Sequence, residues 1–177
     1  MNWYDSVFEV IDMRSFSNLW YWIALAVLWS SVSHWVLGVP FDSILRARRG
    51  KPDTAMDDCE NLTRINVNRI LYIADVSGLW IALFGSMFIT ALGISAFMYD
   101  IEFSQAVFLM AFPMVLLGWM SVRTARAIET LGLGGEALIR RLMRHRFFTQ
   151  LIGVASIFVT AMYGMYQNLN VGPFGGF

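Results

Sequence analysis

Four long stretches of mostly apolar residues alternate with polar segments along this chain. The first, third and fourth stretches contain no formal charge, and the second contains only Asp75 near its beginning. About 20 apolar residues in helical conformation cross the ~30 Å hydrocarbon core of a membrane. The pattern therefore predicts an all-α membrane protein, a single bundle over residues 1–177, with transmembrane helices at approximately 19–39, 70–99, 103–122 and 147–169.

Composition agrees with a membrane protein. Hydrophobic residues make up 57% of the chain and charged residues only 15%, whereas soluble domains average about 25% charged. The formal net charge is zero, which gives no indication of nucleic-acid binding. The single cysteine, Cys59, excludes an intrachain disulfide.

Basic residues are strongly segregated along the chain. Twelve of the 13 Lys and Arg residues fall in or beside two segments, 40–69 and 123–146. Because basic residues accumulate in cytoplasmic loops, we expect both segments in the cytoplasm of a bacterium and both termini on the outer side of the inner membrane. Short amphipathic helices are expected before the first span and before the fourth. The acidic residues Asp5, Glu9, Asp12, Asp100 and Glu102 fall on the outer side.

Small residues recur at every fourth position of the second span, where they would form one continuous ridge. Small side chains let helices approach closely in lipid. We therefore predict that this ridge packs against the first and fourth spans, with Trp29, Trp35 and Trp119 facing lipid or a partner. The ridge comprises Ala74, Gly78, Ala82, Ser86 and Thr90.

His34 and Asp75 lie at similar predicted depths in the first and second spans. Both are about 7 to 8 Å inside the cytoplasmic boundary at a rise of 1.5 Å per residue. Ionisable groups in spans are costly and usually face the bundle interior. We predict a buried polar pair that sets the register of the two helices, with a proton-responsive or ligand-binding site as the alternative.

The two histidines of the chain, His34 and His145, are also candidate ligands for a b-type haem between helices. His145 stands between arginines at the start of the fourth span, and a cation-rich interfacial helix explains it more simply. No zinc-like spacing and no catalytic set of Ser, His and Asp is present, so the sequence predicts no metal, no cofactor and no enzyme.

The helix leading to the fourth span interleaves apolar residues with four arginines. Such a segment is typical of one that binds anionic lipid headgroups, and the acidic face of a partner protein is the alternative. The four residues are Arg140, Arg141, Arg144 and Arg146. The preceding glycines, from Gly132 to Gly135, are interpreted as a hinge.

Three segments carry a resemblance to a known family. They are Phe8–Ser30 together with Ser33–Asp42, Arg123–Glu129 and Ile157–Leu169. In these segments the chain resembles a small membrane-protein family of alphaproteobacteria related to Rhodobacter, whose members are often named components of the SufBCD complex. The resemblance implies a Gram-negative inner membrane in bacteria rich in respiratory and photosynthetic complexes. It supplies no catalytic residues.

Two functions are compatible with these features. In the first, the protein is a non-catalytic accessory, assembly or stabilising subunit of a larger inner-membrane complex, in contact with lipids and other membrane-protein subunits. Few interior polar groups and short loops favour this interpretation. In the second, it is a small electron-transfer protein that binds b-haem or quinone through His34 and His145.

Overall fold

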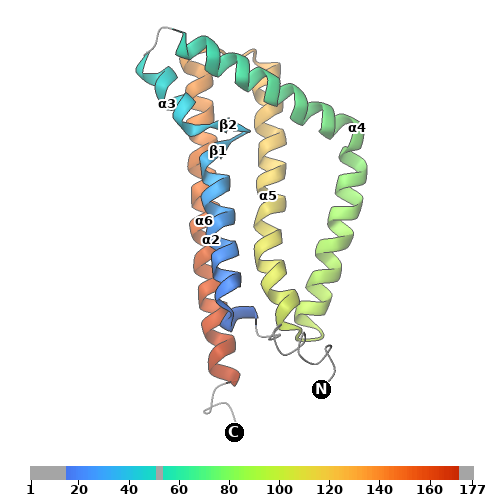
Figure 1. Ribbon diagram of the computed structural model, residues 1–177. Coiled ribbons are helices and arrows are strands. Elements are labelled where there is room, and N and C mark those ends of the chain that lie inside the picture. The colour runs from blue at the N-terminus through green and yellow to red at the C-terminus, as the bar shows by residue number, and fades with distance from the viewer. Residues whose placement is uncertain (1–14, 51–53, 172–177) are drawn as a thin grey trace, which may run out of the picture.

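The computed structural model describes residues 15–50 and 54–171, and within them the chain is almost entirely helical (Figure 1). The predicted helix before Arg14 and the C-terminal tail lie outside the described residues. The described elements, in chain order, are η1 (Ser15–Ser17), α2 (Leu19–His34), β1 (Trp35–Val36), β2 (Val39–Pro40), α3 (Phe41–Arg49), α4 (Ala55–Phe97), α5 (Glu102–Thr130) and α6 (Gly135–Val171).

Three of these helices, α4, α5 and α6, are long and apolar enough to cross a membrane. The prediction of a helical chain is confirmed, and three of the four predicted spans correspond to helices with the length and apolar composition of membrane spans. The first predicted span is shorter than expected, because α2 has 16 residues and rises only about 24 Å. It lies alongside α6 (Figure 1), so the first apolar stretch forms part of the bundle without the length of a full span.

A tight β-hairpin ends α2 five residues before the predicted boundary. Leu37 and Gly38 both have positive φ, 52° and 78°, as a two-residue type I′ turn requires. Gly38 is also held close to α4, because a Cβ on it would lie 2.8 Å from Oδ1 of Asn66. The hairpin thereby places Val36 and Val39 in the interior.

The first predicted cytoplasmic loop is mostly helical, which corrects the assignment of 40–69 as a loop. It forms α3 and the first part of α4, which crosses the ends of α6 and α5 before α4 bends sharply (Figure 1). A buried stripe at every fourth position holds this first part against the other helices. The stripe consists of Ala55, Cys59, Thr63, Val67 and Leu71.

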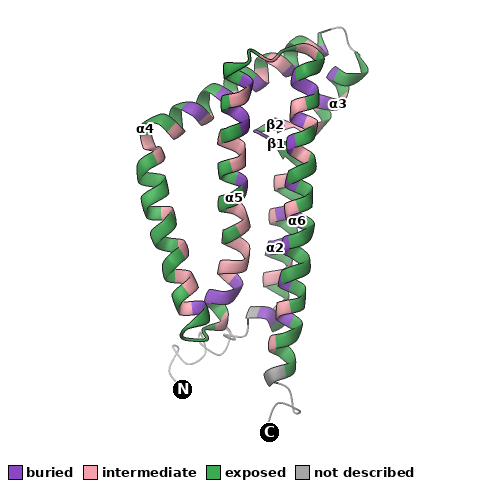
Figure 2. Ribbon diagram, turned by 180° about the vertical axis from the view of Figure 1, so that it is seen from behind, coloured by how far each residue is buried: buried purple, intermediate pink, exposed green. Residues whose placement is uncertain are grey.

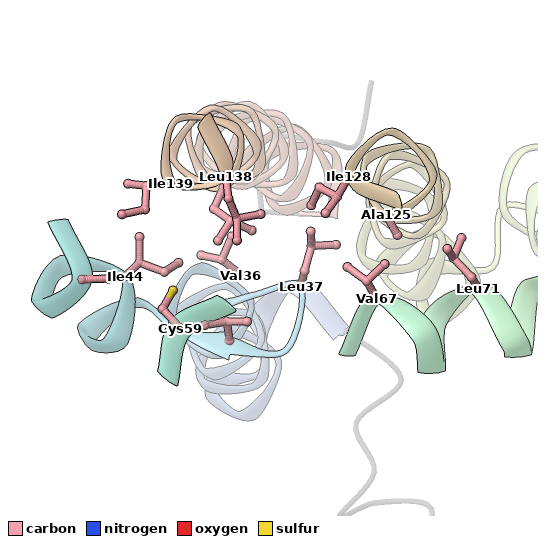
Figure 3. Packing of buried hydrophobic residues seen from close by; sticks show 13 residues of the cluster. Val36, Leu37, Ile44, Cys59, Val67, Leu71, Ala125, Ile128, Leu138 and Ile139 are labelled. Atoms are coloured by element: carbon pink, nitrogen blue, oxygen red, sulfur yellow. The ribbon is translucent and has the colours of Figure 1, made fainter. Parts of the chain in front are cut away.

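The main hydrophobic core lies at this same end of the molecule (Figure 3). Leu138, Ile139 and Leu142 of α6 belong to it. The segment expected to lie on lipid before the fourth span is therefore the first part of α6, and its apolar side chains pack inside the protein. We call this end, formed by residues 36–50, 54–71 and 123–146, the arginine-rich end.

A defined turn joins α5 to α6 where a hinge was expected. Leu133 N–H donates to the Ile128 carbonyl and Gly132 N–H donates to the Glu129 carbonyl. Together with φ of 54° at Gly132, these bonds make a Schellman C-cap. Gly135, the first residue of α6, donates its N–H to the Glu60 carboxylate, so an acidic side chain of α4 caps α6 at its positive end.

Candidate interaction surfaces

The small residues that pack helices together lie on α6. The face formed by Gly153, Ser156, Thr160 and Gly164 is buried. A Cβ on Gly153 would lie 2.7 Å from the Trp29 ring, so α2 and α6 approach closely there. The predicted contact between the first and fourth spans is therefore observed, but Trp29 is buried rather than turned to lipid.

The predicted ridge on α4 has no partner helix within the described chain. Ala74 and Gly78 are half-buried, whereas Ala82, Ser86 and Thr90 are exposed. A Cβ on Gly78 would meet no atom within 4 Å. The prediction that this ridge packs against the first and fourth spans is wrong, because α4 turns away from α2 and α6 at its bend (Figure 1).

The part of α4 with the length and composition of a membrane span buries very few of its residues within the described chain. We call this part the bare span of α4. Of its most apolar 18-residue window only 6% is buried, compared with 17% in α5 and 28% in α6. Figure 2 shows this part of α4 as mostly exposed with some intermediate positions, while α5 and α6 also carry buried positions. Its exposed large side chains include Leu79, Trp80, Ile81, Leu83, Phe84, Met87 and Phe88.

Asp75 has a partner other than His34. Its carboxylate accepts a hydrogen bond of 3.1 Å from Nη2 of Arg126 on α5. The structure thus replaces the predicted His34–Asp75 pair with an Asp75–Arg126 pair, because the bend places this part of α4 beside α5. Both side chains are more than half exposed, so the ion pair contributes at most about 1 kcal/mol in water.

The two histidines have different surroundings. His34 is exposed at the end of α2, where its ring meets the Trp35 ring edge-on at 5.6 Å. His145 is buried, with Nδ1 lying 3.2 Å from Oγ1 of Thr124 on α5. The hydrogen bonds of the described residues do not join the two imidazoles, and His145 serves as a contact between α5 and α6.

A polar network at the other end of the molecule was missed by sequence reasoning. Gln105, fully buried, donates from Nε2 to the Ala96 carbonyl at 2.9 Å and accepts from Nε2 of Gln167 at 2.6 Å. Phe16 N–H donates to the Glu102 carboxylate at 2.9 Å. The sequence signal was the uncharged polar Gln105 near the start of α5, but its side-chain partner Gln167 lies 62 residues away along the chain.

The four predicted lipid-binding arginines separate into two groups. Arg146 lies over the Phe41 ring, 3.4 Å from its centroid, and donates from Nε to the Ser33 carbonyl at 3.3 Å. It therefore holds α6 against α2 and α3. Arg140 and Arg144 are exposed and Arg141 is half-buried, so these three remain available to a ligand.

No protein-family model, curated protein or solved structure matches this chain. Within residues 15–50 and 54–171, no cluster of three or more His, Cys, Asp or Glu side chains could hold a metal ion. The surfaces that distinguish the described part of the chain are the bare span of α4 and the basic surface at the arginine-rich end.

Proposed function

We propose that this protein is a non-catalytic accessory, assembly or stabilising subunit that binds another membrane protein through the bare span of α4. The observation that carries the proposal is the isolation of this span, only 6% of which is buried in its most apolar window. The partner belongs to a larger complex, respiratory or photosynthetic, in a bacterial inner membrane.

The chemistry of the α4 surface favours a protein partner over lipid alone. Bulky apolar side chains suit either, but a row of small residues suits close approach of a second helix. Gly78 and Gly85 both leave open space where a Cβ would stand. A helix backbone can therefore come close to α4 on this side, which bulky lipid-facing residues would prevent.

Replacing Gly78 by leucine tests this proposal. Because a Cβ at Gly78 meets nothing within 4 Å, we expect the isolated protein to be as stable as wild type, or more stable by up to about 1 kcal/mol from helix propensity. A leucine should nevertheless wedge the partner helix away and reduce the co-purified partner at least about tenfold, equivalent to about 1.4 kcal/mol. Gentle solubilisation, affinity purification and quantitative mass spectrometry measure the partner.

Leu79→Ile is the matched control, since Leu79 is 79% exposed and the exchange keeps its volume. It should retain both the fold and the partner. Equal recovery of the same partner with wild-type protein and G78L would contradict the proposal.

The inner-membrane orientation rests on the distribution of charge. Arg46, Arg64, Arg123 and Arg140 all lie at the arginine-rich end, whereas Glu102 lies at the opposite end beside Phe16. Under the positive-inside rule, the arginine-rich end is cytoplasmic. The resemblance to the Rhodobacter-like family supports a Gram-negative inner membrane.

Reporter fusions test this orientation. Fusions after Phe177 or within 96–103 should give periplasmic alkaline-phosphatase activity, and fusions near Lys51 or Gly134 should give cytoplasmic fluorescence. The reason is that translocating either arginine-rich segment would carry several guanidinium groups across the membrane. A cytoplasmic C-terminus would contradict the orientation.

A further inference from the structure

We propose that a groove between α3 and α6 at the arginine-rich end binds the phosphate of an anionic phospholipid. The groove has a volume of about 500 Å³. This inference is independent of the partner proposed for α4. The groove is lined by Ala47, Arg48, Arg49, Gly50, Met56, Glu136, Ile139 and Arg140.

Local structure brings three guanidinium groups to this groove. Arg48 and Arg49 end α3, which terminates at Gly50 with φ of 64°. Arg140 comes from the first turns of α6, and the core beneath both helices fixes their separation. Guanidinium forks bind phosphate oxygens through pairs of parallel hydrogen bonds, so the three arginines suit a phosphate group.

The groove carries an excess of positive charge. Among the described lining residues the only acidic one is Glu136, whose carboxylate lies 3.9 Å from Nη1 of Arg140 with both side chains largely exposed. A loose, exposed pair of this kind is weak. Among the described residues that line the groove, the arginines thus outnumber the carboxylates by three to one, a balance that favours an anionic ligand.

An apolar floor distinguishes this groove from a site for a free anion. Ala47 and Ile139 belong to the buried core, and Met56 packs against it. A lipid presents a phosphate next to glycerol and acyl carbons, which matches cationic side chains beside an apolar floor. Soluble phosphate would use the arginines alone.

The depth of the groove also fits a headgroup. The uncharged part of α6 begins at Phe147, seven residues after Arg140, which is about 10 Å along the helix. The polar layer of a bilayer extends roughly 5 to 8 Å beyond the hydrocarbon on each side. A flexible arginine side chain covers the remaining distance, so Arg140 can reach a lipid phosphate.

The test is a titration of the full-length protein in neutral detergent with dioctanoyl phosphatidylglycerol, followed by calorimetry. Parallel titrations use dioctanoyl phosphatidylcholine and inorganic phosphate. We expect saturable binding of phosphatidylglycerol only, and a loss of about a hundredfold in affinity for the variant in which Arg48, Arg49 and Arg140 are all glutamine. This follows from about fivefold per arginine near an anionic lipid.

Two further variants distinguish loss of the binding groove from a folding defect and from a general loss of positive charge. Glu136→Gln removes the competing carboxylate, so phosphatidylglycerol should bind about two- to fivefold more tightly. Arg69→Gln, which removes an exposed arginine of α4 outside the groove lining, should change affinity by less than about twofold. The proposal is overturned if the triple variant binds like wild type, if E136Q does not bind more tightly, if R69Q loses as much affinity as the triple variant, or if inorganic phosphate binds equally well.

Discussion

Replacing Gly153 by alanine is expected to lower the free energy of unfolding by about 2 to 3 kcal/mol. The added Cβ would lie 2.7 Å from Cε3 of Trp29 and 3.1 Å from Cζ3. The indole is rigid and buried between α2, α5 and α6, so neither partner can yield without moving a helix. Overpacking of a tight interior typically costs about 1 to 3 kcal/mol. Denaturant unfolding of the purified protein in detergent measures the loss.

Gly85→Ala is the matched control for this substitution. Gly85 is also a helical glycine, and a Cβ there meets nothing within 4 Å. That variant should be as stable as wild type, or more stable by up to about 1 kcal/mol from helix propensity. Trp29→Leu combined with Gly153→Ala should cost less than the sum of the two single changes, because the smaller side chain relieves the clash. Strictly additive effects would contradict the contact.

Gln105 lies at the end of the molecule opposite the arginine-rich end. Replacing it by leucine is expected to lower the free energy of unfolding by about 2 kcal/mol. Ala96 lies in the last turn of α4, and Gln105 Nε2 donates to its carbonyl. The last carbonyls of a helix have no intrahelical donor, and a buried acceptor left unsatisfied costs about 1 to 3 kcal/mol. Denaturant unfolding gives the loss in stability, and hydrogen exchange should show faster opening where α4 meets α5.

Gln150 supplies the control for this prediction, because it is an exposed glutamine on α6 and Gln150→Leu should leave stability within about 0.5 kcal/mol of wild type. Gln167→Leu should also cost about 1 to 3 kcal/mol, because it leaves Oε1 of the fully buried Gln105 without its donor while the Ala96 carbonyl stays paired. Equal stability of Q105L and wild type would show that the Gln105 network does not stabilise the helix ends.

The structure divides the molecule into a packed part and an open part. The packed part is the arginine-rich end together with α2, α5 and α6, where two hydrophobic clusters and the α6 small-residue face lie. The open part is the span of α4, attached through the α4–α5 turn at one end and the buried stripe at the other. A partner that covers α4 would therefore bind without disturbing the core.

Hydrophobic patterning predicted four spans, and three of them correspond to helices long and apolar enough to cross a membrane. Long uncharged stretches reveal such helices because lipid requires every backbone polar group to be satisfied within the segment. The two segments in which the arginines cluster lie together at one end of the molecule. Both features are local in sequence, so the chain determines them without reference to distant contacts.

The end of the first helix and the helical state of residues 55–69 were not predicted, because both involve contacts with distant parts of the chain. Residues 35–40 are as apolar as the helix before them, yet they form a hairpin whose turn at Leu37 and Gly38 packs closely against Asn66 of α4. Residues 55–69 carry many polar groups that favoured a loop. They are helical because their buried stripe, which includes Cys59 and Val67, covers the ends of α5 and α6.

Side-chain partners were the hardest feature to predict. The spacing of small residues is similar in α4 and in α6, but only on α6 do they face other helices of the chain. Equal depth suggested that Asp75 would meet His34, and the bend of α4 instead brought it to Arg126. The sequence by itself determined which segments are helical, apolar and basic. Only the tertiary structure decided which faces meet, because the direction of a helix after a bend depends on the packing of all its neighbours.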